Sequence, residues 1–122
     1  MAFVHEGIKQ IDVNELKEII KDQPKDVVMI DVREREEYDE FHIPGVPLIP
    51  MHNIPNIITE LKKDKEYILV CRSGNRSHHV ARFLKENGIK EAHNFYGGML
   101  TWDEEVKTGL ENVVDDVSKL YK

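Results

Sequence analysis

The sequence is poor in cysteine: its 122 residues contain only one, Cys71. A single cysteine cannot form an internal disulfide, so nothing points to an oxidising compartment. No apolar run approaches the roughly 20 residues that a membrane span needs. At the N-terminus no cationic segment precedes an apolar one, so we expect no signal peptide. These absences predict a cytoplasmic protein that does not act on membranes.

Positive charge is also scarce, because 23 acidic residues outnumber 17 basic ones and give a net charge of −6. A negative chain is a poor non-specific ligand for nucleic acid, so we expect no nucleic-acid partner. Hydrophobic residues make up 40% of the chain and charged residues 33%, which is the balance of a globular protein. The length fits one domain over residues 1–122.

Short apolar runs alternate with helical patterns along the chain. We expect strands at residues 7–11, 27–32, 66–71 and 90–95, and helices at residues 12–22, 34–41, 53–63, 76–88, 97–109 and about 110–121. Residues 42–50 contain three prolines, which indicates a turn and a short edge strand. The alternation predicts an α/β fold with three α/β/α layers around a mainly parallel sheet of about five strands. Ligand sites in such sheets lie at the carboxyl ends of central strands, and Cys71 ends one of them.

The loop after Cys71 has the composition of an anion site. It consists of Arg72, Ser73, Gly74, Asn75, Arg76 and Ser77. Gly and Asn tolerate left-handed backbone angles, so the loop can turn its amides inward as a nest. A following helix adds the partial positive charge of its N-terminus. Cys71 could be only a small buried hydrophobe, but these surroundings favour a thiolate and therefore a nucleophile.

Three motifs carry a resemblance to a known family. The loop "CRSGNRS" (71–77) resembles the active-site loop of the rhodanese-like sulfurtransferases. The stretch "MIDVREREEYDEFHIPGVPLIP" (29–50) resembles their upstream signature, and "GGMLTW" (97–102) resembles their downstream one. The resemblance extends over about residues 7–106. One position departs, since Phe41 stands where the family usually has glycine.

The resemblance implies covalent, two-step chemistry. The Cys71 thiolate would attack the outer sulfur of a small anionic donor such as thiosulfate, and sulfite would leave. The resulting persulfide would pass its sulfur to a thiol, to cyanide or to a protein acceptor. No cofactor is needed, and the nest would stabilise charge on the terminal sulfur. We expect a monomer, with a homodimer as the alternative.

The positions of the other polar residues in these motifs suggest their roles. Arg72 follows the nucleophile directly and is the candidate for holding the donor. Arg76 lies where the loop returns into the helix, so we expect it to brace the loop through a buried carboxylate such as Asp31. The remaining candidates are Asp31, Arg33, Glu37 and His42. We expect them to hold the scaffold, the first three as an ion-pair network, rather than to take part in the reaction.

The six histidines show no HxxxH or similar spacing, and there is no second cysteine. The sequence therefore predicts no metal site. His78 and His79 lie in the first turns of the helix after the loop, where we expect surface exposure, with one of them facing the pocket mouth as the alternative.

Two other functions remain open. Cysteine-dependent phosphatases and arsenate reductases can share this general fold, but their loops run Cys-x5-Arg. Here Cys71 and Arg76 are separated by four residues. The shorter loop encloses a single sulfur atom but is cramped for a tetrahedral oxyanion, which favours sulfur transfer. The second alternative is a non-catalytic module that binds a partner or senses persulfide.

Overall fold

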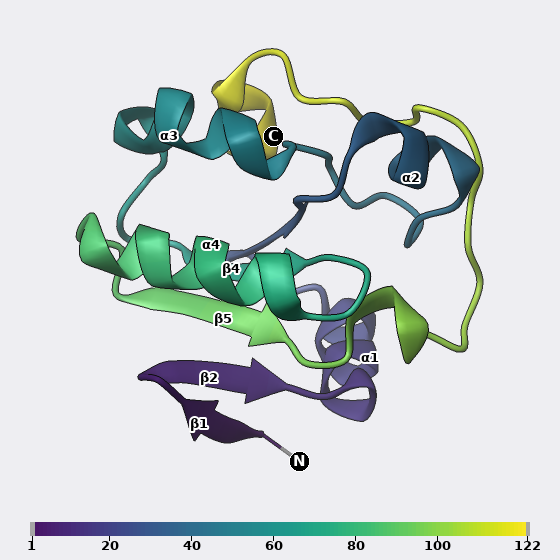
Figure 1. Cartoon of the computed structure of the whole chain (residues 1–122), viewed down its shortest axis with the longest axis horizontal. Coiled ribbons are helices and arrows are strands. Elements are labelled where there is room, and N and C mark those ends of the chain that lie inside the picture. The colour runs from purple at the N-terminus through teal and green to yellow at the C-terminus, as the bar shows by residue number, and fades with distance from the viewer. Residues whose placement is uncertain (1, 122) are drawn as a thin grey trace.

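The computed structural model describes residues 2–121 and is built around a five-stranded sheet (Figure 1). Its strands are β1 (Phe3–His5), β2 (Ile8–Ile11), β3 (Val27–Asp31), β4 (Glu66–Val70) and β5 (Glu91–Phe95). They lie in the order β1-β2-β5-β4-β3. Only the β1–β2 pair is antiparallel, whereas the other three pairs are parallel. The expected three-layer α/β/α class is confirmed, and β1 is an additional strand that the sequence patterns did not indicate.

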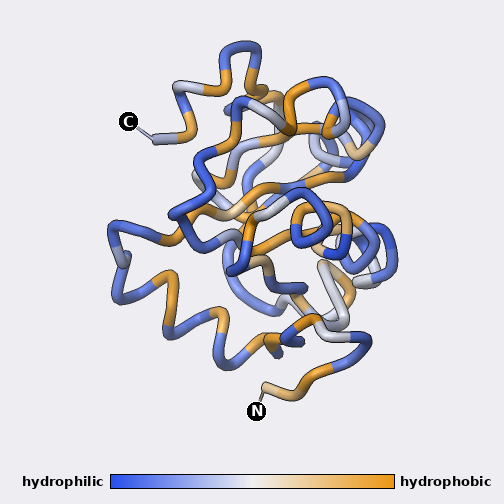
Figure 2. Tube along the Cα trace, turned by 90° about the vertical axis from the view of Figure 1, so that its left-hand side faces the viewer, coloured by the Kyte–Doolittle hydropathy of each residue, from blue (hydrophilic) through white to orange (hydrophobic). Residues whose placement is uncertain are grey.

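Helices cover both faces of this sheet. They are α1 (Val13–Asp22), α2 (Arg35–Glu40), α3 (Ile54–Ile57) and α4 (Asn75–Glu86). Figure 1 shows α4 running along β4 and β5. Figure 2 shows hydrophobic and hydrophilic residues alternating along helical turns, as expected for helices that bury one face.

Alternation along β4 divides the core into two clusters. Tyr67 and Leu69 face the cluster that α3 and α4 cover, whereas Ile68 and Val70 face the cluster that contains Leu16 of α1. Successive side chains of a strand point to opposite faces, so a strand covered on both faces is apolar throughout. The continuous apolar run at residues 66–71 therefore becomes the centre of the fold.

The start of α1 follows the sequence rule for helix caps. The Asp12 carboxylate accepts a hydrogen bond of 2.9 Å from the Glu15 backbone amide, which would otherwise lack a partner in the helix. The helix ends at Gln23, whose backbone is left-handed with a φ of 47°. Within residues 2–121, none of the helices has both the length and the apolar character required to cross a membrane.

Several expected elements are shorter than the patterns suggest. Residues 53–63 form α3 flanked by two 3-10 turns, and residues 97–109 hold only the 3-10 helix Gly98–Leu100. The edge strand expected within residues 42–50 is reduced to isolated bridges at His42 and Leu48. The expected helix at 110–121 is wrong for most of its length, because only Val117–Tyr121 is helical, as a 3-10 turn.

Backbone pairing explains why the C-terminal segment is not a helix. The Leu48 amide donates to the Asn112 carbonyl at 2.9 Å, and the Val114 amide donates to the Leu48 carbonyl at 3.1 Å. These bonds hold the segment extended beside residues 42–50. The chain then crosses the top of the molecule in Figure 1 and places Val117 in the core cluster that α3 and α4 cover.

The turn after β5 packs directly against the backbone that follows β4. Gly97 and Gly98 have φ values of 82° and 57°, which side-chain-bearing residues rarely adopt. The Met99 amide donates to the Cys71 carbonyl at 2.9 Å, and the Leu100 amide donates to the Arg72 carbonyl at 3.0 Å. A Cβ atom at Gly98 would lie 2.4 Å from the Cys71 carbonyl oxygen. Glycine is therefore required at position 98.

We expect Gly98→Ala to lower the free energy of unfolding by about 3 kcal/mol or more, because it combines an unfavourable φ with overlap against backbone. Gly109→Ala is the matched control. Gly109 has a φ of 93°, but a Cβ atom there would meet nothing within 4 Å, so the variant should lose only about 1–2 kcal/mol. Urea denaturation of both variants measures the difference. Equal losses would show that the close approach at Gly98 does not matter.

Candidate active site

Cys71 lies at the carboxyl edge of the sheet, immediately after β4. This strand is central, because it pairs with β3 on one side and β5 on the other. Cys71 has 0% relative exposure and belongs to the core cluster that α3 and α4 cover. The sequence-based placement of Cys71 at the end of a buried strand agrees with this geometry.

Two backbone amides donate to the Cys71 sulfur. The Gly74 amide lies 3.1 Å from Sγ and the Ser77 amide 3.4 Å. Donors arranged in this way suit a negatively charged sulfur, because each N–H dipole points its positive end at it. The cradle therefore consists of these two amides, with the Ser77 hydroxyl oxygen 3.2 Å from Sγ beside them.

The backbone of the loop explains how these donors reach the sulfur. Gly74 has a φ of 94° and is the residue that precedes the first turn of α4. This left-handed angle reverses the chain, so that the helix begins at Asn75 and runs away from Cys71. Ser77 is in the first turn, where backbone amides have no partner inside the helix. The expected combination of a nest and a helix N-terminus is thus present for Gly74 and Ser77.

A buried polar network supports the cradle from the side of β5 and β2. The Ser77 hydroxyl donates its proton to Asn94 Oδ1 at 2.5 Å, and Asn94 Nδ2 donates to the Gly74 carbonyl at 2.9 Å. The same nitrogen donates to Gln10 Oε1 at 2.7 Å. The sequence patterns missed Asn94 and Gln10. Their polar side chains within otherwise apolar strands were the available signal, since buried polar groups need partners.

Arg76 is braced by Glu37 rather than by Asp31, so the expected partner is wrong. Its two terminal nitrogens contact the two Glu37 carboxylate oxygens at 2.7 and 2.8 Å. Both side chains are partly exposed, at 36% and 29%. This two-pronged contact with Arg76 lowers the pKa of Glu37 to about 2, against an opposing effect of burial. The pair ties α4 to α2.

Asp31 instead pairs with Arg33, its neighbour at the end of β3. The Arg33 Nη2 atom lies 2.9 Å from Asp31 Oδ2, and both side chains are buried. The same nitrogen donates to the Phe41 carbonyl at 2.8 Å. Phe41 has a φ of −168°, an extended angle open to any residue, so its replacement of glycine causes no strain. Arg33 therefore fixes the end of α2 against the sheet.

His42 is buried in a separate polar group. Its ring stacks on Tyr38 with centroids 3.8 Å apart, and its Nε2 lies 2.8 Å from Glu111 Oε1. These contacts, with those of Lys107, hold the pKa of Glu111 at about 2. No contact in residues 2–121 joins His42 to the Cys71 cradle, which agrees with a scaffold role.

The surface exposure expected for His78 is wrong, because this side chain is buried, whereas His79 is exposed.

The remaining loop residues face solvent. Arg72, Ser73 and Asn75 are exposed. Within the described part of the chain, the Arg72 guanidinium makes no hydrogen bond or ion pair. Its charge is therefore free to meet an anion beside the buried sulfur.

The Glu37–Arg76 pair should make stability depend on pH in acid. The folded pKa of Glu37 is about 2, below the ordinary 4.5. The pair therefore stabilises fully above about pH 4.5, and this contribution is lost as the pH falls toward 2. We expect Glu37→Gln to lower the free energy of unfolding by about 1 kcal/mol at pH 6, and by less at pH 3.

Glu36→Gln is the matched control for this experiment, because Glu36 is an exposed carboxylate on the same helix. Urea denaturation at pH 6 and pH 3 gives the difference between wild type and each variant. A Glu37→Gln difference that stays constant with pH, as expected for Glu36→Gln, would contradict the assigned pairing.

Comparison with known proteins agrees with this geometry. The profile of the Rhodanese-like domain family matches residues 12–105. YtwF of Bacillus subtilis (strain 168), described as a candidate sulfurtransferase, is 45% identical over 100 residues, which cover 82% of this chain and 95% of YtwF. GlpE of Coxiella burnetii (strain RSA 331), named thiosulfate sulfurtransferase, is 34% identical over 77% of this chain and 86% of its own length. A crystal structure of a rhodanese-like domain protein from Staphylococcus aureus superimposes with a TM-score of 0.73 at 39% identity, covering 81% of this chain and 96% of that one. The chain therefore belongs to the rhodanese-like domain family.

Proposed function

We propose that this protein is a sulfurtransferase that carries a sulfane sulfur on Cys71. The observation that carries the proposal is the convergence of the Gly74 and Ser77 backbone amides on the Cys71 sulfur at the start of α4. The sulfurtransferase names of the relatives support the same reaction class. The thiosulfate named for GlpE makes that ion the first donor to test.

In the first half-reaction the Cys71 thiolate attacks the outer sulfur of thiosulfate. A new sulfur–sulfur bond forms to Cys71, and the bond inside thiosulfate breaks. Its electron pair leaves with sulfite, so no external oxidant, reductant or proton donor is needed. The terminal sulfur of the persulfide then carries the negative charge, and the Gly74 and Ser77 amides that donate to Cys71 Sγ support its stabilisation by the same loop.

In the second half-reaction an acceptor attacks the terminal sulfur. With cyanide, a carbon–sulfur bond forms, the bond to Cys71 breaks, and thiocyanate leaves. The electron pair of the broken bond restores the Cys71 thiolate. A thiol acceptor or a protein acceptor follows the same exchange, so the site does not need a separate acid.

Access to the sulfur limits the donor to a small anion. Cys71 is fully buried, so the exposed side chains of the loop must move aside to admit the donor. Arg72 is exposed and free of carboxylate partners within residues 2–121, which suits it to hold the sulfonate end of thiosulfate. Arg76 is engaged by Glu37 and is better suited to hold the loop.

The same pairing weakens the phosphatase alternative. In a Cys-x5-Arg loop the arginine binds the transferred oxyanion, but here the guanidinium of Arg76 is occupied by the Glu37 carboxylate. A persulfide carrier or sensor remains the second candidate, since it would use the same Cys71 cradle. It differs from the enzyme in turnover, because a carrier passes its sulfur only to a specific protein.

We expect Cys71→Ser to abolish sulfur transfer while the fold is kept. Wild type incubated with thiosulfate should gain the mass of one sulfur atom and form thiocyanate from cyanide. The variant should do neither, because a hydroxyl at this site cannot carry sulfane sulfur. Mass spectrometry and thiocyanate detection give the two readouts. Transfer that persists in the variant, or Cys71-dependent hydrolysis of an aryl phosphate by wild type, would overturn the proposed reaction.

The two arginines of the loop should separate in kinetics. Arg72→Ala should raise KM for thiosulfate and change the free energy of unfolding by only about 0–1 kcal/mol, because Arg72 is exposed. Arg76→Ala leaves Glu37 unpaired, so it should lower stability by about 1 kcal/mol and reduce kcat by loosening the loop. Steady-state kinetics and urea denaturation measure both effects.

The control for these variants is Arg35→Ala, which removes the same charge from an exposed site on α2. It should leave both KM and kcat near the wild-type values. A larger KM effect at Arg76 than at Arg72 would mean that the two roles are reversed.

A further inference from the structure

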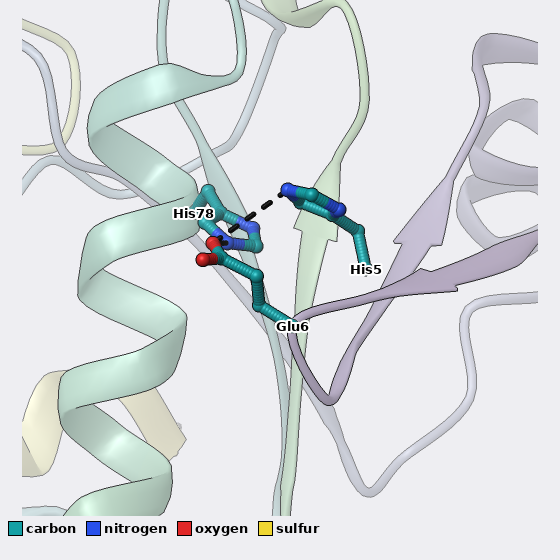
Figure 3. A group of neighbouring side chains, drawn as sticks. All are labelled: His5, Glu6 and His78. Atoms are coloured by element: carbon teal, nitrogen blue, oxygen red, sulfur yellow. Dashed lines mark hydrogen bonds and ion pairs between the residues drawn. The ribbon is translucent and has the colours of Figure 1, made fainter.

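A cluster of metal-ligating side chains lies where the β1–β2 hairpin meets α4. Figure 3 shows His5 and Glu6 of the hairpin facing His78 of the helix. Glu6 Oε1 lies 2.7 Å from His78 Nε2 and 3.6 Å from His5 Nε2. One ligand atom from each residue lies within 4.8 Å of the other two. The Cys71 chemistry uses none of these three side chains.

The backbone at Glu6 is unusual for its residue type. Glu6 has a φ of 53° and Gly7 a φ of 79°, so both residues of the hairpin turn are left-handed. Such turns favour asparagine, aspartate or glycine at the first position, and glutamate there is energetically unfavourable. The turn directs the Glu6 carboxylate onto the two imidazole rings (Figure 3). A strained residue with an aimed side chain suggests a function for that side chain.

We propose that His5, Glu6 and His78 bind a divalent transition-metal ion of the zinc type. Two imidazole nitrogens and one carboxylate oxygen are a donor set that zinc accepts, with water completing the coordination. Ligand atoms around tetrahedral zinc lie about 3.3 Å apart, since the bonds are about 2.0 Å long. Glu6 Oε1 and His78 Nε2 must therefore move slightly apart while His5 moves closer, and His5, at 64% exposure, has the freedom to do so. Glu6 is 47% exposed, which leaves the ion a path from solvent.

One cation competes for the carboxylate. Arg82 Nη1 lies 3.6 Å from Glu6 Oε2, the oxygen that does not face the histidines. This contact is long and exposed, so it contributes little. It leaves Glu6 Oε1 for the metal.

The site is connected to the Cys71 loop through Gln10. Gln10 Nε2 donates to the Ile8 carbonyl at 3.1 Å and lies 3.0 Å from His78 Nδ1. His78 Nδ1 is therefore the acceptor, and Nε2 carries the proton that faces Glu6. A metal on Nε2 moves that proton to Nδ1, where it needs an oxygen partner. Gln10 must then turn its amide to offer its oxygen.

Rotation of the Gln10 amide has an energetic cost and a structural consequence. It breaks the Gln10 contacts with the Ile8 carbonyl and with Asn94 Nδ2, and Asn94 holds both Gly74 and Ser77. Metal binding is therefore weakened by the cost of rearranging the amides. By thermodynamic reciprocity, it also loosens the support of the sulfur cradle. The proposal does not depend on sulfur transfer itself, because none of the ligands belongs to the cradle.

The sequence could not reveal this cluster. Glu6 and His78 are 72 positions apart in the sequence, and histidine spacing along a helix is the usual signal of a metal site. Only the antiparallel return of β1, which the sequence patterns did not indicate, carries His5 to α4. The inference therefore departs from the sequence-based expectation of no metal site.

The test uses the Cys71→Ser variant, because a free thiol would itself bind the metal. Co²⁺ and Zn²⁺ are titrated into this variant, with calorimetry for Zn²⁺ and visible absorption for Co²⁺. We expect one ion per chain. Adding His5→Ala or Glu6→Gln should weaken binding at least about tenfold. These two residues are exposed, so their substitution should spare the fold, whereas loss of the buried His78 would not.

His52→Ala in the same background is the matched control. His52 and Glu34 form an exposed pair 3.7 Å apart, but no third ligand joins them among residues 2–121. This substitution should leave binding unchanged. Absence of stoichiometric binding, or equal binding after His5→Ala and Glu6→Gln, would overturn the site. Side-chain amide resonances of Gln10 and Asn94 should shift with Zn²⁺ in nitrogen-15 spectra, and unshifted resonances would overturn the coupling.

Discussion

The close approach of the Gly97–Gly98 turn to the Cys71 backbone is the constraint on which the site depends. The turn donates two amides to the carbonyls of Cys71 and Arg72 at 2.9 and 3.0 Å. These bonds engage the two carbonyls with the turn, while the Gly74 and Ser77 amides donate to the sulfur. The parallel pairing of β4 with β5 brings the two segments to the same edge of the sheet. The cradle is therefore a consequence of strand order as much as of loop sequence.

Two polar groups then hold the loop from opposite sides. On the β5 side, Asn94 ties the Gly74 carbonyl and the Ser77 hydroxyl together inside the protein. On the α2 side, the partly exposed Glu37 carboxylate holds Arg76. Buried neutral bonds give geometric precision without the cost of burying charge, whereas an exposed ion pair adds a weaker, salt-sensitive contact. The residues that contact the sulfur are therefore held by the buried hydrogen bonds between uncharged groups on the β5 side.

The sequence was sufficient where local rules and long-range structure agree. Cys71 was placed correctly because a continuous apolar strand, a glycine-containing turn and a helix start follow one another directly. The prediction of a helix at residues 110–121 was wrong because this segment meets its packing and hydrogen-bonding requirements in another conformation. Leu48 offers backbone partners to that segment, and pairing with a distant strand edge cannot be read from a local pattern. The partner of Arg76 was missed for the same reason, since Asp31 and Glu37 are equally plausible until the α2 geometry is known.

Charge balance around the loop bears on how the proposed reaction would release its product. Arg76 is neutralised by Glu37, so Arg72 is the cation of segment 71–77 that lacks a carboxylate partner within residues 2–121. Thiosulfate and sulfite are both anions, and a site with two free arginines would hold the leaving sulfite as firmly as the donor. Product release limits turnover in many enzymes, so firm retention of sulfite would slow the cycle. Neutralising Arg76 therefore leaves enough positive charge to attract the donor while limiting retention of sulfite. In the proposed persulfide state, the single negative charge of the thiolate would move to the terminal sulfur, and the Gly74 and Ser77 amides, which are part of the fold and leave with neither substrate, would be its nearest donors.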